Sequence, residues 1–567
     1  MKTYKLYKSE HIHDLREMLQ KNAKTYATRP LFYEKVKGEY AQTTYAEFYS
    51  NVKTLGGALV RRGLAGKRII VTGENCYAWC LSYITTVCGL GVVIPVDKEI
   101  PAEELANIAK ISGASAIIYS GKYEEKVAGV GKKLQKYTFD EILDICSNSD
   151  SCSDEDIAAY ENRSIDIDEM AVLLFTSGTT GVSKGVMLSQ RNLCCNIENI
   201  AKLVKLTPED TALSVLPLHH VYECTAGFLY PMSCGAAIAR SEGVRYIMKN
   251  LKEIHPTKMI CVPLLLETMY NKMWANIRKK GIEDKVKTII KATNALKPES
   301  VRMAAKRKVF AEIHESLGGK LNLLVSGGAP VDPQVLRGLR DLGFNVIQGY
   351  GLTECRPLAA VNPDTAPKDR SAGVVLPGGE LKIIDADSEG IGEICYRGDN
   401  VMLGYYKMPE ETDQVKKNGW LHTGDLGYID EDGYLIITGR KKNVIVTANG
   451  KNIFPEELET YLTRSNYVAE CVVVGYMNEK KKDYDIVALV YPDFNYAKEV
   501  LGDGATEAAI YDQITAAVDE VNTTVQTYKR IHMTIMRNEE FPKNSSRKIK
   551  RMGVADLARE EYLAKRG

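Results

Sequence analysis

The sequence lacks an apolar segment that is both long and unbroken enough to form an obvious membrane-spanning helix. One uncharged stretch, residues 77–96, has the length, but Gly89, Gly91 and Pro95 interrupt it, whereas a spanning helix needs about 20 consecutive apolar residues. We therefore expect a buried helix followed by a buried strand there. Residues 1–15 also lack the apolar core of a secretory signal, so we expect a cytoplasmic protein.

An excess of charge is absent as well, because 74 Lys and Arg residues face 73 Asp and Glu residues. Proteins that bind nucleic acid usually carry a strongly basic face, so we expect no nucleic-acid partner. The 13 cysteines form no CxxC pair and no disulfide-dense frame, which favours reduced thiols. No fixed-period repeat is present, and 567 residues at about 150 per domain predict three or four structural units.

Short β-branched runs alternate with helical stretches in the first two thirds of the chain. The run at 67–73 and the helical stretch at 101–112 illustrate the pattern, which returns at 211–218, 257–263 and 320–328. Such alternation is typical of βαβ units around a largely parallel sheet. The sequence therefore predicts an α/β fold.

The pattern of residue types changes three times along the chain. Residues 271–316 are polar, rich in lysine and helically spaced, which predicts a solvated helical insert. Residues 379–406 read as strand–turn–strand and predict antiparallel sheet or a small barrel. Beyond about residue 440 the order is α-β-β-α, typical of a compact α+β unit, and the charged junction 439–443 is a candidate hinge.

A glycine- and hydroxyl-rich loop lies between a predicted strand and a predicted helix, in "LLFTSGTTGVSKGVMLSQRNL" at 173–193. Such a loop can direct several backbone N–H groups at one anion, and a lysine adds a mobile positive charge, so polyphosphate is its natural ligand. The order differs from a Walker loop, because the lysine precedes a glycine in "GVSKG". The structural alternative is a flexible surface turn. The candidate ligands are Thr176, Ser177, Gly178, Thr179, Thr180, Gly181 and Lys184.

This loop resembles the phosphate loop of the adenylate-forming superfamily, which includes acyl-CoA synthetases, luciferases and adenylation domains. Further motifs of that superfamily follow in the same order. They are "PLHH" (217–220), "VSGGAP" (325–330), "QGYGLTE" (348–354), "GWLHTGDLGYIDEDGYLIITGRKKN" (419–443), "GKNIFPEELE" (450–459) and "PKNSSRKIKR" (542–551). The chain is most similar to long-chain fatty acyl-CoA synthetases, through the insert at 271–316 and the segment at 450–459.

The resemblance implies a division into two domains. Residues 1–440 would form a large N-terminal domain of two doubly wound α/β subdomains plus a small β-barrel. Residues 441–567 would form a small, mobile α+β C-terminal domain, with a hinge near Lys442.

The resemblance also implies the reaction. A long-chain fatty acid would react with ATP, in the presence of Mg²⁺, to give acyl-AMP and pyrophosphate, and the acyl group would then pass to CoA. Medium-chain or aryl acids, and acyl carrier protein as acceptor, stay open. A non-catalytic nucleotide-binding relative and a luciferase-like oxygenase are weaker alternatives. No aspartate lies between Thr211 and Tyr230 to hold an amino acid's ammonium group, and a fatty substrate would make transient membrane contact natural.

By the same resemblance, four residues carry catalysis: Thr353 and Glu354 around the α-phosphate and Mg²⁺, Lys548 between carboxylate and phosphate, and His220 as a gate. Thr176 would assist Glu354 with the metal, and Tyr350 would stack on adenine. Besides the phosphate loop and Lys548, the nucleotide- and acyl-binding positions are Gly327, Gly328, Ala329, Gly349, Tyr350, Gly351, Thr353, Asp425, Arg440 and Gly450. Read alone, a single His, Asp or Arg of this kind is more often structural.

Two departures from the superfamily pattern accompany these residues. "CRP" follows Glu354 where Ser or Thr and a small residue are usual, which affects the neighbouring acyl contacts. Arg547 stands where a glycine usually precedes the lysine. A lysine needed for adenylation would obstruct the incoming thiol, so the C-terminal domain would rotate about Lys442 and bring Gly450 to the pantetheine passage.

Overall fold

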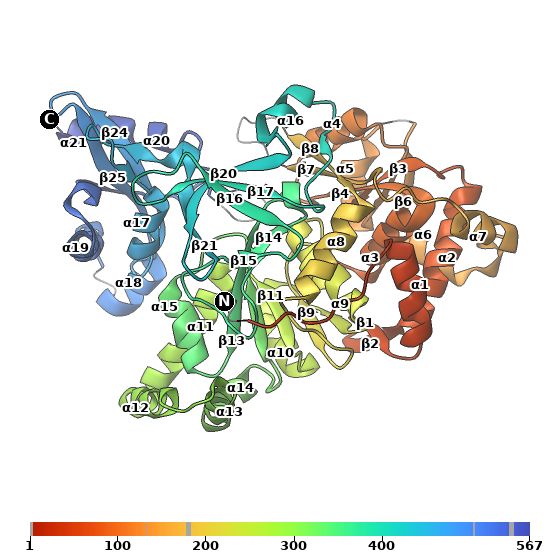
Figure 1. The fold of residues 1–567 in the computed structure, drawn as a ribbon, viewed down its shortest axis with the longest axis horizontal. Coiled ribbons are helices and arrows are strands. Elements are labelled where there is room, and N and C mark those ends of the chain that lie inside the picture. The colour runs from red at the N-terminus through yellow and green to blue at the C-terminus, as the bar shows by residue number, and fades with distance from the viewer. Residues whose placement is uncertain (1–3, 132, 177–182, 503–504, 544–548, 567) are drawn as a thin grey trace.

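Five parts of the chain are described by the computed structural model: residues 4–131, 133–176, 183–502, 505–543 and 549–566. The strands assemble into a seven-stranded sheet, a fourteen-stranded sheet, a three-stranded sheet and one small hairpin. Figure 1 shows the two large sheets at the centre and right of the molecule, and the C-terminal unit, in blue, at the left.

The seven-stranded sheet belongs to the first α/β subdomain and has the order β18-β8-β7-β4-β3-β5-β6. Its strands from β7 to β6 are parallel, and both faces are covered, because Ile69 and Val71 pack with α2 and α3 while Ile70 and Ile94 pack with α4 and α5. The predicted doubly wound architecture is therefore confirmed here. The strands are β3 (Lys67–Thr72), β4 (Gly91–Val96), β5 (Ala116–Tyr119), β6 (Gln135–Thr138), β7 (Met170–Thr176), β8 (Lys184–Ser189) and β18 (Gly404–Tyr405), and the helices are α2 (Tyr45–Arg61), α3 (Tyr77–Thr85), η1 (Thr86–Leu90), α4 (Ala102–Ser112), η2 (Gly121–Tyr123), α5 (Glu124–Ala128), α6 (Phe139–Ser147), η3 (Ser149–Ser151) and α7 (Asp154–Glu161).

The second α/β subdomain supplies the parallel half of the fourteen-stranded sheet, in the order β13-β12-β11-β9-β10-β1. Leu323 and Ile347 face α8 and η4, whereas Leu324 and Val346 face α10, α11 and α15, so this sheet is doubly wound too. Its strands are β1 (Pro30–Val36), β2 (Glu39–Thr44), β9 (Thr211–Ser214), β10 (Ala237–Arg240), β11 (Lys258–Cys261), β12 (Leu323–Ser326) and β13 (Asn345–Gly351), and its helices are α1 (Leu15–Thr25), α8 (Gln190–Ala201), η4 (Glu223–Leu229), α9 (Tyr230–Ser233), η5 (Val244–Tyr246), α10 (Ile247–Ile254), α11 (Pro263–Lys279), α12 (Glu283–Asn294), α13 (Glu299–Val309), α14 (Ala311–Ser316) and α15 (Pro333–Asp341).

The helical insert predicted at 271–316 is present as the end of α11 followed by α12, α13 and α14, which project from the bottom of the molecule in Figure 1. The broken apolar stretch 77–96 forms α3, η1 and β4, all largely buried, as the glycines and the proline indicated. Across the described parts of the chain, none of the helices combines the length and apolarity needed to cross a bilayer.

Antiparallel strands extend the second sheet beyond β13, in the order β14-β15-β21-β20-β17-β16. The antiparallel strands predicted after residue 370 are thus present. The pairings among described residues form a path from β16 to β13, and β19 pairs with β20 beside that path. The elements are η6 (Thr353–Cys355), β14 (Leu358–Val361), β15 (Gly373–Val375), β16 (Glu380–Ile384), β17 (Gly392–Arg397), α16 (Pro409–Val415), β19 (Lys416–Lys417), β20 (Trp420–Ile429) and β21 (Tyr434–Arg440).

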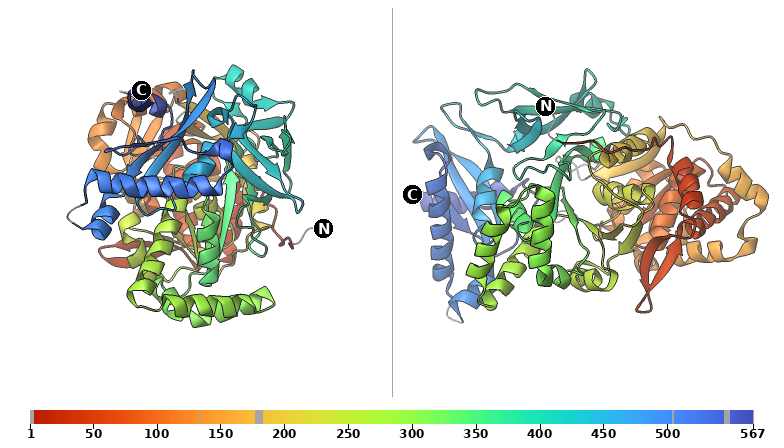
Figure 2. Two further views of the ribbon diagram at one scale, coloured as in Figure 1. Left: turned by 90° about the vertical axis from the view of Figure 1, so that its left-hand side faces the viewer. Right: turned by 60° about the horizontal axis from the view of Figure 1, so that its bottom comes forward.

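The C-terminal unit has its own core, in which α17 and α19 cover the antiparallel pair β24–β25, and β26 runs parallel to β25. Figure 2 shows it projecting from one end of the molecule. Its elements are η7 (Lys441–Asn443), β22 (Ile445–Val446), β23 (Asn452–Ile453), α17 (Pro455–Leu462), β24 (Val468–Asn478), β25 (Asp483–Pro492), α18 (Phe494–Leu501), α19 (Glu507–Thr524), η8 (Thr527–Lys529), β26 (Met533–Met536), α20 (Val554–Leu557) and α21 (Arg559–Arg566).

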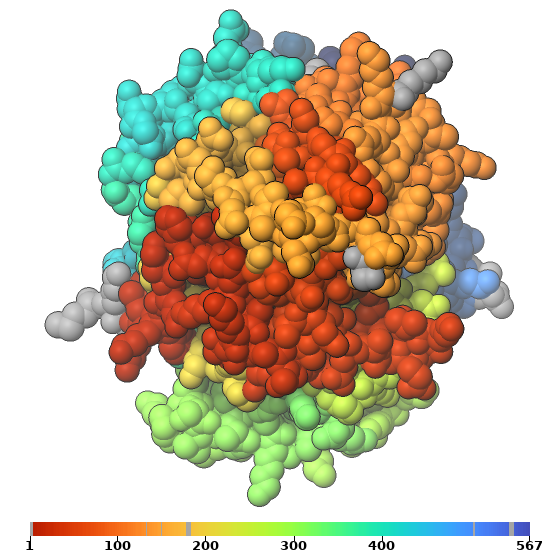
Figure 3. All heavy atoms as spheres, turned by 90° about the vertical axis from the view of Figure 1, so that its right-hand side faces the viewer, coloured from red at the N-terminus to blue at the C-terminus, as the bar shows by residue number. Residues whose placement is uncertain are grey.

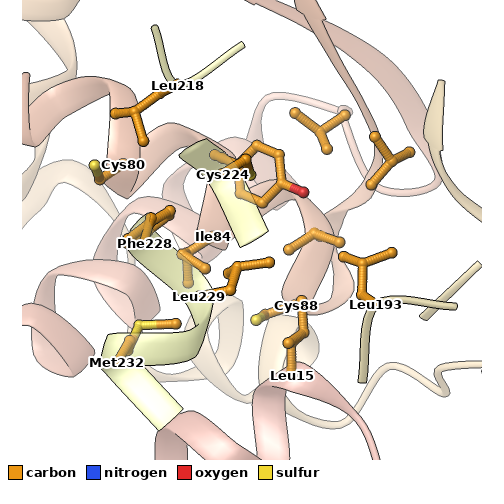
Figure 4. Packing of buried hydrophobic residues seen from close by; sticks show 14 of the residues in the cluster. Leu15, Cys80, Ile84, Cys88, Leu193, Leu218, Cys224, Phe228, Leu229 and Met232 are labelled. Atoms are coloured by element: carbon orange, nitrogen blue, oxygen red, sulfur yellow. The ribbon is translucent and has the colours of Figure 1, made fainter. Parts of the chain in front are cut away.

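The largest apolar core joins the two α/β subdomains. Cys80 and Ile84 of α3 pack with Phe228 of η4 and Leu193 of α8, as Figure 4 shows. Helix η4 therefore has one face in this core and the other toward the second sheet. The part of the chain that contains α1 and α2, red in Figure 3, lies at the end of the molecule opposite the C-terminal unit.

Candidate active site

The predicted phosphate loop connects two strands. β7 ends at Thr176 and β8 begins at Lys184, and these two residues are register partners in an antiparallel pair. Thr176 Oγ1 donates to the Lys184 carbonyl oxygen at 3.4 Å. The sequence predicted a helix directly after the loop, but strand β8 comes first and α8 follows. Ser177, Gly178, Thr179, Thr180 and Gly181 lie outside the described residues, so the structure places only the base of the loop.

Tyr405 of β18 links Lys184 to Glu354. Its hydroxyl donates to Glu354 Oε1 at 2.8 Å, and Lys184 Nζ lies 5.0 Å from the centre of its ring. Burial and the charge of Glu354 raise the pKa of the Tyr405 hydroxyl above its usual range, so it stays protonated and keeps donating. The structure thus brings Lys184 and Glu354, which were predicted from two separate motifs, into contact with the same tyrosine.

The loop that carries Thr353 and Glu354 is shaped by close backbone approach. A Cβ on Gly351 would lie 1.7 Å from the Pro357 carbonyl oxygen, so glycine is required there. Thr353 and Glu354 then form the one-turn helix η6, and the Glu354 carbonyl accepts from the Met402 N–H at 2.8 Å. These contacts fix the Glu354 backbone against the segment that carries Tyr405.

Tyr350, Asp425 and Arg440 form a second cluster. The Tyr350 hydroxyl donates to Asp425 Oδ2 at 2.6 Å, and Arg440 Nε lies 2.8 Å from Asp425 Oδ1. Asp425 and Arg440 are register partners on β20 and β21. Burial, with the nearby charge of Asp425, raises the pKa of Tyr350 well above its usual range. Asp425 therefore presents a carboxylate, a group that can accept several hydrogen bonds at once.

Gly327, Gly328 and Ala329 follow β12 at the carboxyl edge of the second sheet. A Cβ on Gly327 would lie 2.9 Å from the ring of Tyr222, whose hydroxyl donates to the Val325 carbonyl at 2.9 Å. The predicted strand end therefore holds a tyrosine ring against bare backbone. Sequence reasoning missed Tyr222, whose one signal is its place two residues after His220.

His220 lies at the same edge, in the segment between β9 and η4, where its ring centre is 4.2 Å from that of His219. Burial, helped by the neighbouring His220, lowers the pKa of His219 to about 3, so His219 is neutral at pH 7 although Asp97 lies 3.7 Å away. A neutral, buried His219 is suited to a structural role, and His220 is the ring beside the carboxyl edge.

An apolar cavity of about 40 Å³ starts beside Tyr222 and Gly349 and runs between the second sheet and the helices α8 and η4. That volume is roughly three water-sized spheres, so a bound alkyl chain has to displace side chains. Gly349 is adjacent to Tyr350, which places the upper end of the cavity one residue from the Tyr350–Asp425 cluster. The walls are Ile200, Val204, Leu206, Ala212, Tyr222, Ala226, Tyr230, Pro231, Lys258, Met259, Ile260, Leu323, Val325, Gly349, Leu358 and Val361.

Lys442 lies between two anchored neighbours. Lys441 Nζ is 2.9 Å from Glu393 of β17, and Asn443 Nδ2 donates to Glu456 of α17 at 2.6 Å, so one neighbour is held by each domain. Desolvation and the charges of Arg440 and Arg551 lower the pKa of Lys442.

Two C-terminal predictions remain. Lys548 lies outside the described residues, although the bridge between Lys543 and Ile549 marks the base of its segment. Gly450 turns the β22–β23 hairpin with φ +72°, and its N–H donates to the Thr447 carbonyl at 2.8 Å. A separate contact ties the domains together, since Arg464 Nε lies 2.7 Å from Asp332, just beyond Ala329.

The carboxylates present suit Mg²⁺ held largely by a nucleotide. Among the described residues no group of three or more His, Cys, Asp or Glu side chains could hold a metal on its own. Mg²⁺ in nucleotide sites usually takes one or two carboxylates and completes its shell with phosphate and water oxygens. Glu354, whose Oε1 accepts from Tyr405, fits that pattern, and Thr176 is the last residue of β7 before the loop.

Comparison with known protein families assigns the chain to one family. Residues 19–406 match the family model described as AMP-binding enzyme, and residues 442–561 match that of the AMP-binding enzyme C-terminal domain. The chain is 30% identical to long-chain-fatty-acid–CoA ligase 5 of Rattus norvegicus over 82% of its length and 73% of the relative's. It is 27% identical to long-chain-fatty-acid–CoA ligase FadD15 of Mycobacterium bovis, over 92% of both chains.

Solved structures share the fold. ATP-bound MatB from Rhodopseudomonas palustris superposes with a TM-score of 0.75 at 22% identity, covering 97% of this chain and 100% of that one. At this identity the likeness concerns the arrangement of the elements alone.

Proposed function

The chain belongs to the AMP-binding enzyme family and is an AMP-forming acid–CoA ligase, and we propose that it activates a fatty acid with ATP and transfers the acyl group to CoA. One observation carries the proposal. The apolar cavity ends at Gly349, next to Tyr350, whose hydroxyl is bonded to Asp425. A hydrophobic acid and a nucleotide would therefore meet at this single point of the sheet edge.

The first step joins two anions, so the residues around it must neutralise charge. A carboxylate oxygen of the acid attacks the α-phosphorus of ATP, and pyrophosphate leaves. Asp425 would accept hydrogen bonds from the ribose hydroxyls, while Tyr350 would face adenine and Thr353 the α-phosphate. Lys184, held over the Tyr405 ring, would meet the outgoing phosphates, and Lys548 would bridge carboxylate and α-phosphate. Mg²⁺ would be held by Glu354 and Thr176 with phosphate oxygens, where it offsets phosphate charge.

In the second step the thiolate of CoA attacks the acyl carbonyl, the acyl–phosphate bond breaks, and AMP leaves. Lys548 would have to withdraw first, which is the purpose of rotation about Lys442. The opposite anchoring of Lys441 and Asn443 supports a pivot at this residue. After rotation Gly450 would line the pantetheine passage, because a glycine leaves room beside the backbone. His220 would gate the acyl side.

Several finer points belong to the same proposal. All 13 cysteines are free thiols, which supports a reducing, cytoplasmic location. Transient contact with a membrane surface would follow from a fatty substrate, and acyl carrier protein stays open as a second acceptor.

The test is a pair of assays on the purified chain. Mixing ATP, Mg²⁺ and a panel of fatty and aryl acids should release pyrophosphate, and adding CoA should give acyl-CoA of the expected mass. Pyrophosphate release without any thioester would mean an adenylase rather than a ligase. A protein that makes no mixed anhydride from any acid would refute the proposal and favour a non-catalytic nucleotide-binding relative.

A further inference from the structure

The apolar cavity has a charged residue at its inner end. Among its walls, one side chain carries a charge: Lys258, the first residue of β11. Lys258 is the register partner of Ala212 on β9 and of Leu323 on β12, and both of these also line the cavity. The three form one rung across the sheet, at its amino-terminal edge, and this rung is the floor of the cavity.

The depth of the cavity follows from strand geometry. The floor lies level with Leu323, the first residue of β12. The mouth lies level with Gly327, which is four residues further along the chain, just past the end of β12, and beside Gly349 in the strand register. At about 3.3 Å per residue this is a depth of about 13 Å. With carbon–carbon bonds near 1.5 Å, an extended alkyl chain advances roughly 1.3 Å per carbon, so roughly ten carbons fill the depth.

The floor of the cavity differs from its walls because polar contacts hold the floor in place. Lys258 Nζ donates to Asn322 Oδ1 at 2.8 Å and lies 3.5 Å from Asp210, which also accepts from Thr257 at 2.7 Å. Only 17% of the Lys258 side chain is exposed, so its aliphatic stem faces the cavity while its ammonium is held at the strand edge. A longer chain that pushes the Lys258 ammonium aside has to break its hydrogen bond to Asn322 and part it from Asp210, whereas a shift of the apolar walls breaks no polar contact of this kind.

A second layer supports the floor from below. The Tyr7 hydroxyl donates to Asp364 at 2.8 Å, and Asp364 also accepts from the Lys205 N–H at 2.8 Å. Burial raises the pKa of the Asp364 carboxyl group, while the positive charge of Lys258 acts in the opposite direction. Asp364 and Lys258 are therefore close enough to interact electrostatically. The N-terminal segment is thus tied to the same edge as Lys258, which further resists any opening of the floor.

We propose that Lys258, held by Asn322 and Asp210, is a specificity-determining residue that limits the acyl chain to about ten carbons. The inference rests on the proposed function, since it concerns the depth of the acyl site. It narrows that function to medium-chain acids, although the named relatives are long-chain ligases. Longer chains would have to displace the Lys258 stem and break its contacts.

The experiment compares kcat/KM for straight-chain saturated acids of roughly 6 to 18 carbons. An additional methylene that a pocket cannot accept costs about tenfold or more, so the wild-type value should fall at least about tenfold between decanoate and hexadecanoate. Lys258→Ala removes the stem and should raise the hexadecanoate-to-decanoate ratio at least about tenfold. Lys272→Ala, an exposed lysine on α11, is the matched control and should leave the ratio unchanged.

Lys258→Ala leaves the Asp210 carboxylate without its lysine, so the double variant Lys258→Ala/Asp210→Asn guards against misfolding and should show the same shift in ratio. Folded variants that keep the wild-type ratio, or a wild-type enzyme that prefers hexadecanoate, would overturn the assignment of Lys258. In either case adenylation itself would persist. Loss of acyl-adenylate formation from every acid in the wild-type protein would instead refute the proposed function, and this inference with it.

Discussion

Tyr405 donates a 2.8 Å hydrogen bond to Glu354 while its ring lies beneath Lys184, so one side chain orients both a predicted metal ligand and a predicted phosphate-binding cation. Tyr405 belongs to β18, a strand of the first sheet, whereas Glu354 follows β13 of the second. The contact therefore joins the two α/β subdomains at the point where a nucleotide would bind.

Tyr405→Phe removes this hydrogen bond and keeps the ring under Lys184. A hydrogen bond to a charged group is worth about 1.5–3 kcal/mol, so kcat/KM for ATP should fall about tenfold or more, with a higher Mg²⁺ requirement in pyrophosphate exchange. The matched control is Tyr406→Phe, whose hydroxyl accepts from Arg68 at 2.9 Å on the far side of the strand. Equal losses in both variants would contradict a role for Tyr405 in orienting Glu354.

Because of the buried Glu223 carboxyl group, we expect the stability of the fold to depend on pH. Burial raises its pKa from 4.5 to about 8, and its Oε1 accepts from Ser214 at 2.5 Å, so it is protonated in the fold at pH 7. The folded form binds the proton more tightly than the unfolded form does. Its contribution to stability is therefore full below pH 4.5 and declines as the pH rises toward 8, by about 1.4 kcal/mol per pH unit.

Thermal unfolding scans at several pH values check this expectation. Glu223→Gln is neutral at every pH and should flatten the decline in Tm, with its largest gain over wild type near pH 8. Glu431→Gln, on the exposed turn between β20 and β21, should keep the wild-type slope. A Glu223→Gln variant with an undiminished slope would mean that another group causes the decline.

Lys442→Pro tests the pivot. Proline fixes φ and removes the backbone N–H, so acyl-adenylate formation should stay within roughly twofold of wild type while thioester formation falls at least about tenfold. Lys441→Ala, which removes the contact with Glu393 but leaves the backbone free, is the control. Parallel loss of both half-reactions in Lys442→Pro would refute a hinge at this residue.

Lys548→Ala should give the reverse pattern. Loss of a charge that stabilises the first transition state costs about a hundred- to a thousandfold, so ATP–pyrophosphate exchange should collapse. Transfer of the acyl group from a supplied acyl-adenylate to CoA should persist. Lys550→Ala, two residues along the same basic segment, should retain exchange; unimpaired exchange in Lys548→Ala would rule out the bridging role.

Sequence reasoning found the elements whose signals are local. The glycines and proline within 77–96 predicted a helix broken before a strand, and the lysine-rich spacing of 271–316 predicted the helical insert; both are confirmed. The strand after the phosphate loop was missed, because "KGVMLS" is too short for its periodicity to exclude a helix.

The contacts that organise the candidate site were beyond sequence reasoning, because their partners come from distant strands. Tyr405 and Glu354 are 51 residues apart, and Tyr350 and Asp425 are 75 apart. The floor formed by Lys258, Ala212 and Leu323 depends on the register of three parallel strands, which no local pattern specifies. A motif gave Glu354 and Asp425, but neither Tyr405 nor Lys258 stands in one.

The ion pair between Arg464 and Asp332 holds the C-terminal unit against the second α/β subdomain. Asp332 accepts from the Gln334 N–H at the start of α15 and so belongs to the rigid edge that follows the Gly327–Ala329 segment, while Arg464 belongs to the C-terminal unit. Turning that unit away means parting a partly exposed pair of opposite charges, and dissolved salt weakens such pairs. With the proposed rotation, the balance between the two orientations would therefore depend on the ionic strength of the surrounding medium.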